Sequence, residues 1–293
     1  MSRAETLLDD SARAAARLPP LLVEAEKVAH GVITGGHGRR RSGPGESFWQ
    51  FRNYMPGDEP RSINWRKSAQ GDRLLVRETE WAAAQSVWLW RDASPSMQFR
   101  SHDRLPTKRH RAEVLLLALS CLLARGGERM ALIGEDVAPS GGKPALARMA
   151  SRLGHDAAAG CDIPDMRRDI ASGSHIVMMG DFLSSAESYR PFIRGLANLS
   201  CRGILVQVLD PAETAFPYRG RVDARGCEND GRIVLPRAEA IRDIYLSRLA
   251  GHQHELLDMA RGLGWDFLVH ETADNIHPAL LALYTRLVTR PHR

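Results

Sequence analysis

The sequence predicts an α/β protein in which a doubly wound sheet forms a three-layer α/β/α domain behind an N-terminal arm. Three observations support this prediction. From about residue 82 onward, short apolar runs alternate with helical stretches, which is typical of a parallel sheet covered on both faces. The 293 residues are enough to bury a full core without disulfides or metals. A composition with 43% hydrophobic and 26% charged residues excludes disordered and low-complexity proteins.

Five strands and five helices are expected in the main domain. Apolar runs predict strands at residues 86–91, 130–134, 175–180, 203–209 and 265–269. Apolar residues at helical spacing predict helices at residues 108–125, 145–153, 185–199, 237–263 and 276–288. In such sheets ligands bind beyond the carboxyl ends of the strands, where the strand order reverses. We therefore expect the functional site in the loops that follow the strands.

The N-terminal arm is assigned to residues 1–81 and the main domain to residues 82–293. Apolar residues at helical spacing predict a helix near the start of the arm, and Pro19-Pro20 ends it. Residues 31–45 contain six glycines around Arg39, Arg40 and Arg41, a composition that predicts a basic loop without secondary structure.

Composition indicates a cytoplasmic protein that does not insert into a membrane. The longest apolar runs, such as residues 114–124, are well short of the roughly 20 residues that cross a bilayer. The first 18 residues lack the apolar core and cleavage site of a secretory signal. The four cysteines are far apart in the sequence, which favours reduced thiols over zinc ligands or disulfides.

The charge balance is mildly basic, with 40 Lys and Arg against 35 Asp and Glu. Arginines and aromatic residues interleave between residues 39 and 67, as in some nucleic-acid surfaces. Glu46, Asp58 and Glu59 interrupt this stretch, and its aromatic residues fit a core equally well. Nucleic-acid binding is therefore disfavoured.

The strongest chemical signal follows the first predicted strand of the main domain. Asp92, Ser94 and Ser96 place one carboxylate and two hydroxyls on a tight turn directly after the apolar run Val87-Trp88-Leu89-Trp90. A hard cation such as Mg²⁺ prefers oxygen ligands of this kind. An alternative is that these side chains cap the turn and the helix that follows it.

This turn resembles the metal-ion-dependent adhesion site of von Willebrand factor type A domains, whose Rossmann-like fold has the same layers. The resemblance implies that Asp181, after the apolar run that begins at His175, is a further ligand of Mg²⁺ or another divalent cation. Cys161 stands where the family has a Thr, and a thiol is a poor ligand for Mg²⁺. Asp162 beside it is a candidate to compensate.

A second resemblance narrows the family. The segments Gly45–Phe48, Phe51–Trp65 and Leu75–Glu78, which include the string Tyr54-Met-Pro-Gly-Asp58, resemble the signature of bacterial domain-of-unknown-function 58 (DUF58) proteins. Asn64 stands where that family usually has Asp. Within the signature we single out five residues of the arm as candidate interaction residues: Arg52, Tyr54, Asp58, Arg61 and Trp65. They form either a structural cluster that fixes the arm to the sheet, or one wall of a cleft near Asp92.

Two incomplete motifs elsewhere are set aside, and a third motif is absent. His252-Gln-His254-Glu255 lies in the predicted helix 237–263 without the second-His spacing of zinc proteases, and we assign it to a solvated helix face. Ser140-Gly141-Gly142-Lys143 lacks the first glycine and the final hydroxyl of a phosphate loop. No nucleophile elbow occurs in the sequence.

Together these signals predict a non-enzymatic, cytoplasmic protein-interaction module. The type A resemblance implies that a partner carboxylate completes the shell of a metal held by Asp92, Ser94, Ser96 and Asp181. The DUF58 resemblance implies a partner, a MoxR-type AAA+ ATPase, for which this chain is an adaptor in a chaperone-like system. Two alternatives stay open: a degenerate scaffold that binds through its arm without metal, and a metal-dependent hydrolase that uses Asp92 and Asp181.

Overall fold

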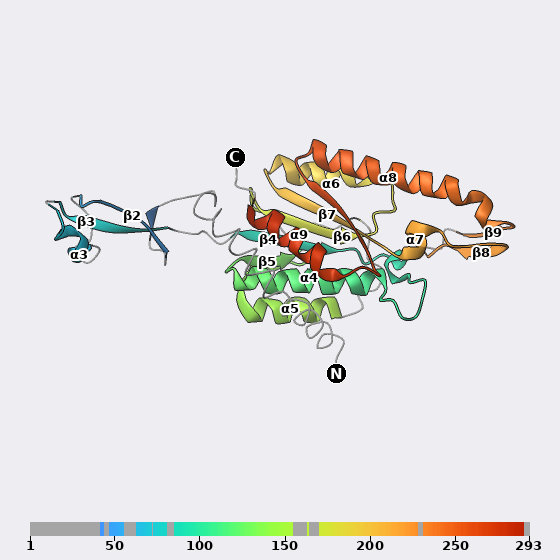
Figure 1. Ribbon diagram of the computed structural model, residues 1–293, viewed down its shortest axis with the longest axis horizontal. Helices are drawn as coiled ribbons and strands as arrows, with labels where there is room; N and C mark the ends of the chain where they lie inside the picture. The colour runs from blue at the N-terminus through green and yellow to red at the C-terminus, as the bar shows by residue number, and fades with distance from the viewer. Residues whose placement is uncertain are drawn as a thin grey trace. The chain divides into compact units, whose positions relative to one another are not determined.

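The computed structural model describes residues 42–43, 47–55, 63–71, 73–80, 85–154, 163, 170–227 and 231–289. The chain divides into two units, each with its own sheet (Figure 1). The larger unit contains Gln85–Leu287, and the smaller contains the described residues between 42 and 80. The boundary that we placed between residues 81 and 82 stays a prediction.

A five-stranded parallel sheet forms the centre of the larger unit. Its strands, in the order in which they pair, are β10 (Asp266–Glu271), β7 (Arg202–Leu209), β6 (His175–Gly180), β4 (Ser86–Arg91) and β5 (Arg129–Leu132). The strand β4 pairs with β5 on one side and with β6 on the other, so the strand order reverses between β4 and β6. The loops after β4 and β6 therefore meet at the position where doubly wound sheets bind ligands.

Helices cover both faces of this sheet, which confirms the predicted three-layer α/β/α fold (Figure 1). One face packs against α4 (Lys108–Arg125), α5 (Gly142–Gly154) and α9 (Ile276–Thr289). The other face packs against α6 (Ala186–Asn198) and α8 (Arg242–Gly262). The strands alternate between the two layers: Val87 and Leu89 of β4 point to the first, and Trp88 and Trp90 to the second.

The predicted boundaries agree closely with these elements where apolar periodicity was strong. The strand β4 and the helix α4 begin and end where expected. The predicted helix 237–263 is instead a 3₁₀ turn, η3 (Ala238–Ile241), followed by α8. Ala238 donates its backbone N–H to the carbonyl of Gly220 over 2.8 Å, which ties the first turn to an earlier segment.

That earlier segment was not predicted. Between β7 and α8 the chain forms α7 (Pro211–Ala215) and an antiparallel hairpin of β8 (Val222–Arg225) and β9 (Arg232–Leu235). Each hairpin strand has only four residues and contains charged side chains, so no continuous apolar run marks it in the sequence.

The smaller unit is a three-stranded antiparallel sheet with one short helix. Its strands pair in the order β1 (Ser42–Gly43), β3 (Leu75–Glu80), β2 (Ser47–Asn53), and α3 (Trp65–Ser68) precedes β3. Asn64 caps α3 by accepting the N–H of Lys67 over 3.0 Å. We expected a loop at residues 31–45, but Ser42 and Gly43 are in a strand because they pair with Thr79 and Glu80 of β3.

Two further expectations concern the N-terminal helix and membrane insertion. The predicted N-terminal helix lies outside the described residues. Among the residues that the structure describes, no helix combines the length and the apolar character that crossing a membrane requires.

Candidate functional site

The turn after β4 folds back on itself through its own polar side chains. Asp92 Oδ1 accepts the backbone N–H of Ser94 over 2.7 Å, a local turn that Asp commonly stabilises. The hydroxyls of Ser94 and Ser96 lie 3.0 Å apart, with Ser96 in the 3₁₀ turn η2 (Pro95–Gln98). Asp92 and Ser94 are buried, so these polar groups depend on partners within the protein.

Asp181 follows β6 directly and joins this turn. The Ser96 hydroxyl donates to Asp181 Oδ2 over 2.6 Å, although the two residues are 85 positions apart. The strand order explains the contact, because β4 and β6 are neighbours and both end at this edge. The structure therefore brings together the four residues that we selected at this edge: Asp92, Ser94, Ser96 and Asp181.

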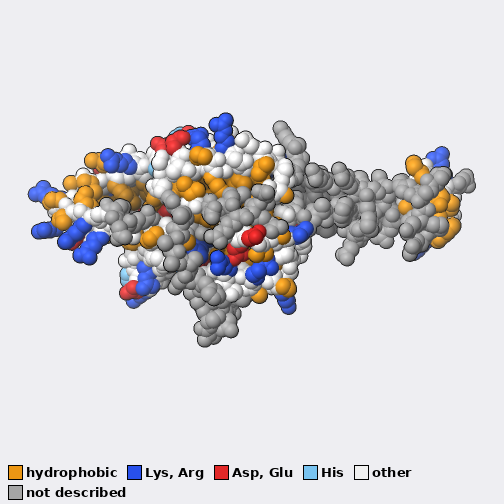
Figure 2. All heavy atoms as spheres, turned by 180° about the vertical axis from the view of Figure 1, so that it is seen from behind, with side chains coloured by type: hydrophobic (Ala, Val, Ile, Leu, Met, Phe, Trp, Pro, Cys, Tyr) orange, Lys and Arg blue, Asp and Glu red, His pale blue; other side chains and the backbone are white. Residues whose placement is uncertain are grey.

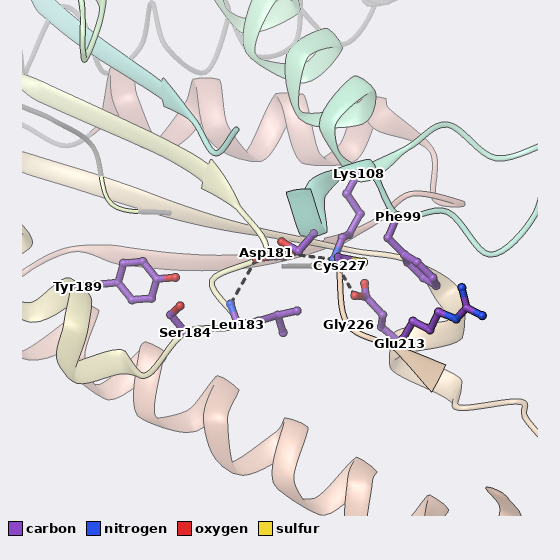
Figure 3. Close-up of a pocket in the computed structure, with 11 residues that line it drawn as sticks. Phe99, Lys108, Asp181, Leu183, Ser184, Tyr189, Glu213, Gly226 and Cys227 are labelled. Atoms are coloured by element: carbon purple, nitrogen blue, oxygen red, sulfur yellow. Dashed lines mark hydrogen bonds and ion pairs between the residues drawn. The ribbon is translucent and has the colours of Figure 1, made fainter. Parts of the chain in front are cut away.

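A buried lysine that we did not predict completes the cluster. Lys108 is the first residue of α4, and its side chain is 0% exposed. Its Nζ donates to Asp181 Oδ2 over 2.9 Å and to Glu213 Oε1 over 2.6 Å (Figure 3). One ammonium group thus links the loop after β6 to the helix α7 that follows β7.

The second carboxylate, Glu213, belongs to a capping box on α7. Asp210 accepts the N–H of Ala212 over 2.8 Å, and Glu213 Oε2 accepts the N–H of Asp210 over 2.7 Å. Asp210 Oδ2 also accepts the N–H of Ser101, which connects α7 to the loop before α4. The sequence Asp210-Pro-Ala-Glu213 after an apolar strand is a signal that would have predicted this cap.

The electrostatics of the cluster keep Lys108 charged. Burial alone lowers the pKa of Lys108, but the negative charges of Asp181 and Glu213 and their hydrogen bonds outweigh it, so the pKa is raised above its ordinary value. At neutral pH the site therefore contains a permanent internal cation between two carboxylates.

As placed, Oδ2 of Asp181 has no lone-pair direction left for a divalent cation. A carboxylate oxygen has two lone-pair directions, and Asp181 Oδ2 already accepts from both the Ser96 hydroxyl and the Lys108 ammonium. Mg²⁺ binds its oxygen ligands at about 2.0–2.1 Å, so it would have to displace one of these donors. A metal ion at this edge stays a prediction, and it would compete with a cation that the chain itself supplies.

A pocket of about 460 Å³ opens beside the cluster (Figure 3). Asp181, Glu213 and Ser96 supply hydrogen-bond acceptors to its wall, and Phe99 and Leu183 supply apolar surface. On the side of the hairpin it is lined by Arg225, Gly226 and Cys227. The hairpin that follows α7 is therefore part of the candidate site.

The loop after β6 is held from behind by α8. Gln207 donates to the carbonyl of Asp181 over 2.8 Å, and Gln253 of α8 donates to Gln207 over 3.0 Å. His252 Nε2 lies 2.6 Å from the carbonyl of Phe182. The solvated helix face that we assigned to residues 252–255 was thus wrong for His252 and Gln253, which are half-buried against this loop because α8 packs on the sheet beside it.

Other predicted site residues are elsewhere or outside the described part of the chain. Cys161, Asp162, Asp58 and Arg61 are outside the described residues. In the smaller unit, Arg52 is in β2, Tyr54 follows it and is half-buried, and Trp65 is the first residue of α3 with 63% of its surface exposed.

Comparisons with known proteins point to one family. The model of the family described as Protein of unknown function DUF58 matches residues 50–255. Uncharacterized protein Rv1480 of Mycobacterium tuberculosis and uncharacterized protein Mb1516 of Mycobacterium bovis are each 26% identical over 281 residues, which cover 87% of this chain and 84% of theirs.

Two solved structures have low similarity to the chain. The conserved hypothetical protein BatB from Bacteroides thetaiotaomicron has a TM-score of 0.41 and 13% identity, covering 71% of this chain and 100% of that one. An aerotolerance-related membrane protein from Bacteroides fragilis has a TM-score of 0.40 and 14% identity, covering 70% and 100%.

Proposed function

The chain belongs to the DUF58 family of proteins of unknown function, and from its geometry we propose that it is a non-enzymatic protein-interaction module. The binding surface is the carboxyl edge of the main sheet, formed by the pocket beside Asp181, the β8–β9 hairpin and the first half of α8. Its position is that of the adhesion site in the von Willebrand factor type A domains that the sequence resembles.

The observation that carries this proposal is an apolar face of the hairpin that its own domain does not fully cover. Cross-strand partners in the hairpin share a face, and the pairs Val222–Leu235 and Ala224–Ile233 make one face entirely apolar. Ile233 is 59% exposed on this face. A two-stranded hairpin is marginally stable alone, so an uncovered apolar face favours a partner that packs on it.

The first half of α8 extends the same surface. The buried residues of α8 are Leu256, Met259 and Ala260, all in its second half. Ile244 near its start is 57% exposed. The ring of Tyr245 lies 4.7 Å from that of Phe216, which joins the start of α8 to the end of α7.

Arginines surround these apolar side chains and define the chemistry of the partner. Figure 2 shows hydrophobic side chains flanked by Lys and Arg at the end of the larger unit where Figure 1 places β8, β9 and the start of α8. Between residues 219 and 248 the exposed arginines are Arg219, Arg221, Arg225, Arg232, Arg237, Arg242 and Arg248, against the described acids Asp223, Glu239 and Asp243. Glu228 and Asp230, in the same span, lie outside the described residues.

An acidic protein segment with apolar side chains fits this surface best. Arginine recognises carboxylates by paired hydrogen bonds, and the apolar face supplies the buried contact area. A second copy of this chain fits poorly, because two arginine-rich surfaces repel each other. From the family resemblance we propose a MoxR-type AAA+ ATPase as the partner, with this chain as its adaptor in the cytoplasm.

The geometry does not favour the hydrolase alternative. A general base needs a carboxylate that is available to accept a proton from water. Asp181 Oδ2 accepts two hydrogen bonds, and each oxygen of Glu213 accepts one. Protonation of Asp181 at Oδ2 would displace a hydrogen bond that holds the loops together. Protonation of Glu213 would remove the negative charge that pairs with Lys108.

Binding through the arm is the second candidate, and exposed apolar residues in the smaller unit support it. Trp65 is 63% exposed, Met55 60% and Leu74 44%. The N–H of Tyr54 donates to the carbonyl of Leu74 over 2.8 Å, which places Met55 and Leu74 near each other. Binding through this surface would need no metal, which agrees with the alternative of a scaffold that binds through its arm.

A binding experiment with matched variants separates the two surfaces. The affinity of the purified chain for the purified MoxR-type ATPase is measured by biolayer interferometry in EDTA. Ile233→Asp and Ile244→Asp should each weaken binding at least about tenfold, because they place a charge in an apolar contact. Leu199→Asp is the control, since Leu199 is 43% exposed at the end of α6, on the opposite edge of the sheet.

Three results would decide between the proposals. Loss of binding only in Trp65→Asp would transfer the function to the arm. Equal binding by all variants would reject both surfaces, and a complete lack of binding by the unmodified chain would reject this ATPase as the partner.

A further inference from the structure

We propose that Lys108 is a tethered cation that occupies the place of a divalent metal ion at the switch point, and that the same carboxylates become a metal site when its amine is removed. This inference goes beyond the proposed function, since it concerns the charge of the site and not its partner. It assigns Glu213, which the sequence did not indicate, to the same cation cluster as Asp181.

The Lys108 ammonium lies between the two carboxylates, in the position that a bound cation would take. Its Nζ lies 2.9 Å from Asp181 Oδ2 and 2.6 Å from Glu213 Oε1. It also lies 5.9 Å from the centre of the Phe99 ring, within the range of a cation–π contact. Asp181 after β6, Glu213 of α7 and Phe99 after η2 thus surround one positive charge.

The ammonium and a divalent ion exclude each other from this cluster. At Asp181 Oδ2 the serine hydroxyl and the ammonium already take the two lone-pair directions, and Oδ1 accepts the N–H of Leu183 over 3.4 Å. The ammonium and a divalent cation bound to the same carboxylate would repel each other. This repulsion is strong where water is scarce, and the Lys108 side chain is 0% exposed. The amine is covalently attached at the first residue of α4, so it stays near the cluster at a high effective concentration.

Without the amine, the remaining groups form a hard-oxygen ligand set. Asp181 and Glu213 would then face each other without a cation between them, with the Ser96 hydroxyl 2.6 Å from Asp181. Two carboxylates and a hydroxyl in a pocket that admits water suit Mg²⁺ or Mn²⁺, which keep several water ligands. The ammonium of Lys108 is therefore a covalently attached charge between groups that could otherwise bind a free ion.

The test compares the unmodified full chain with Lys108→Met, which replaces the amine by a side chain of similar length. Mn²⁺ and Mg²⁺ binding is measured by isothermal titration calorimetry, and thermal unfolding is followed with each ion and with EDTA. We expect no shift for the unmodified chain at millimolar ion. Lys108→Met should unfold at a lower temperature in EDTA, and Mn²⁺ should raise that temperature and bind roughly tenfold or more tightly than to the unmodified chain.

The double variant Lys108→Met with Asp181→Asn is the control, and it should lose the gain in Mn²⁺ affinity. Sub-millimolar binding of either ion by the unmodified chain, abolished by Asp92→Ala, would overturn the proposal. A folded Lys108→Met protein that gains no affinity would also overturn it. If Lys108→Met does not fold, Lys108→Gln takes its place, and the titration of the unmodified chain still decides the first question.

Discussion

Gly180 and Asp92 lie so close that no side chain is possible at the glycine. A Cβ atom on Gly180 would lie 2.9 Å from the Cβ of Asp92 and 3.2 Å from its Oδ2. Gly180 is the last residue of β6 and Asp92 directly follows the neighbouring strand β4. Asp92 donates its N–H to the carbonyl of Met179 over 2.8 Å. The glycine therefore lets the Asp92 carboxylate lie against the end of β6, where it holds the turn of Ser94.

We predict that Gly180→Ala destabilises the protein and displaces Asp92. The added methyl group must push Asp92 away from a well-packed position, which typically costs about 1–3 kcal/mol. Urea unfolding followed by circular dichroism measures the loss. Gly251→Ala is the matched control, because nothing lies within 4 Å of a Cβ at this position in α8, and it should stabilise by about 0.5–1 kcal/mol.

The pairing of Lys108 with Glu213 leads to a second prediction. Glu213→Gln keeps the shape of the side chain and can still cap α7, but it removes one of the two charges that neutralise the buried ammonium. Breaking a buried ion pair on one side costs about 3 kcal/mol. Glu255→Gln, at an exposed position in α8, should change the free energy of unfolding by less than about 0.5 kcal/mol. Equal effects of the two variants would show that the Lys108–Glu213 pair adds nothing to stability.

The layers of the fold were predictable because buried strands and helices have characteristic patterns of apolar residues in the sequence. All four inner residues of β4 and all six of β6 are buried, so these strands read as continuous apolar runs. The turn of Asp92, Ser94 and Ser96 was predictable for a related reason, since its interactions are local. Asp181 was selected because of the resemblance to type A domains, and the pairing of β4 with β6 explains why it lies beside this turn.

The rest of the site depends on contacts that sequence spacing does not encode. Lys108 is 73 residues from Asp181 and 105 from Glu213, and only the packing of α4 and α7 at the sheet edge brings them together. A lysine at the start of a helix reads as a solvent-exposed residue, because lysine is rarely buried without a partner. The hairpin was missed because its four-residue strands contain charged side chains and resemble loops. The strands β2 and β3 of the smaller sheet are longer, but they mix polar and apolar side chains and form no continuous apolar run.

Trp265 and Gly203 support a third prediction, on the opposite edge of the sheet. A Cβ on Gly203 would lie 2.1 Å from Cε3 of the Trp265 ring, so the indole occupies the space beside this glycine. The indole N–H donates to the carbonyl of Cys201 over 3.1 Å, and the ring is 2% exposed. Gly203→Ala should expel the ring and cost about 3 kcal/mol or more, close to the cost of losing a buried aromatic residue.

Fluorescence gives an independent check of this substitution. Expulsion of the Trp265 ring should shift the tryptophan emission to longer wavelength, as water reaches the indole. Gly195→Ala in α6, where nothing lies within 4 Å of an added Cβ, should leave the emission unchanged. Unchanged emission and stability in Gly203→Ala would contradict the placement of the ring.

A final prediction concerns pH, through the buried His270 of β10. Burial and the nearby Arg111 lower the pKa of His270 to about 4, and Asp274 opposes them. Because the pKa in the folded state is below the unfolded value of about 6.5, the unfolded chain binds the proton more readily. The stability due to neutral His270 is therefore complete above pH 6.5 and falls as the pH decreases toward 4.

Between pH 7.5 and 4.5 the unmodified chain should lose about 2 kcal/mol more unfolding free energy than His270→Gln, measured by urea titration at each pH. An identical slope for His270→Gln would show that His270 is not the titrating group.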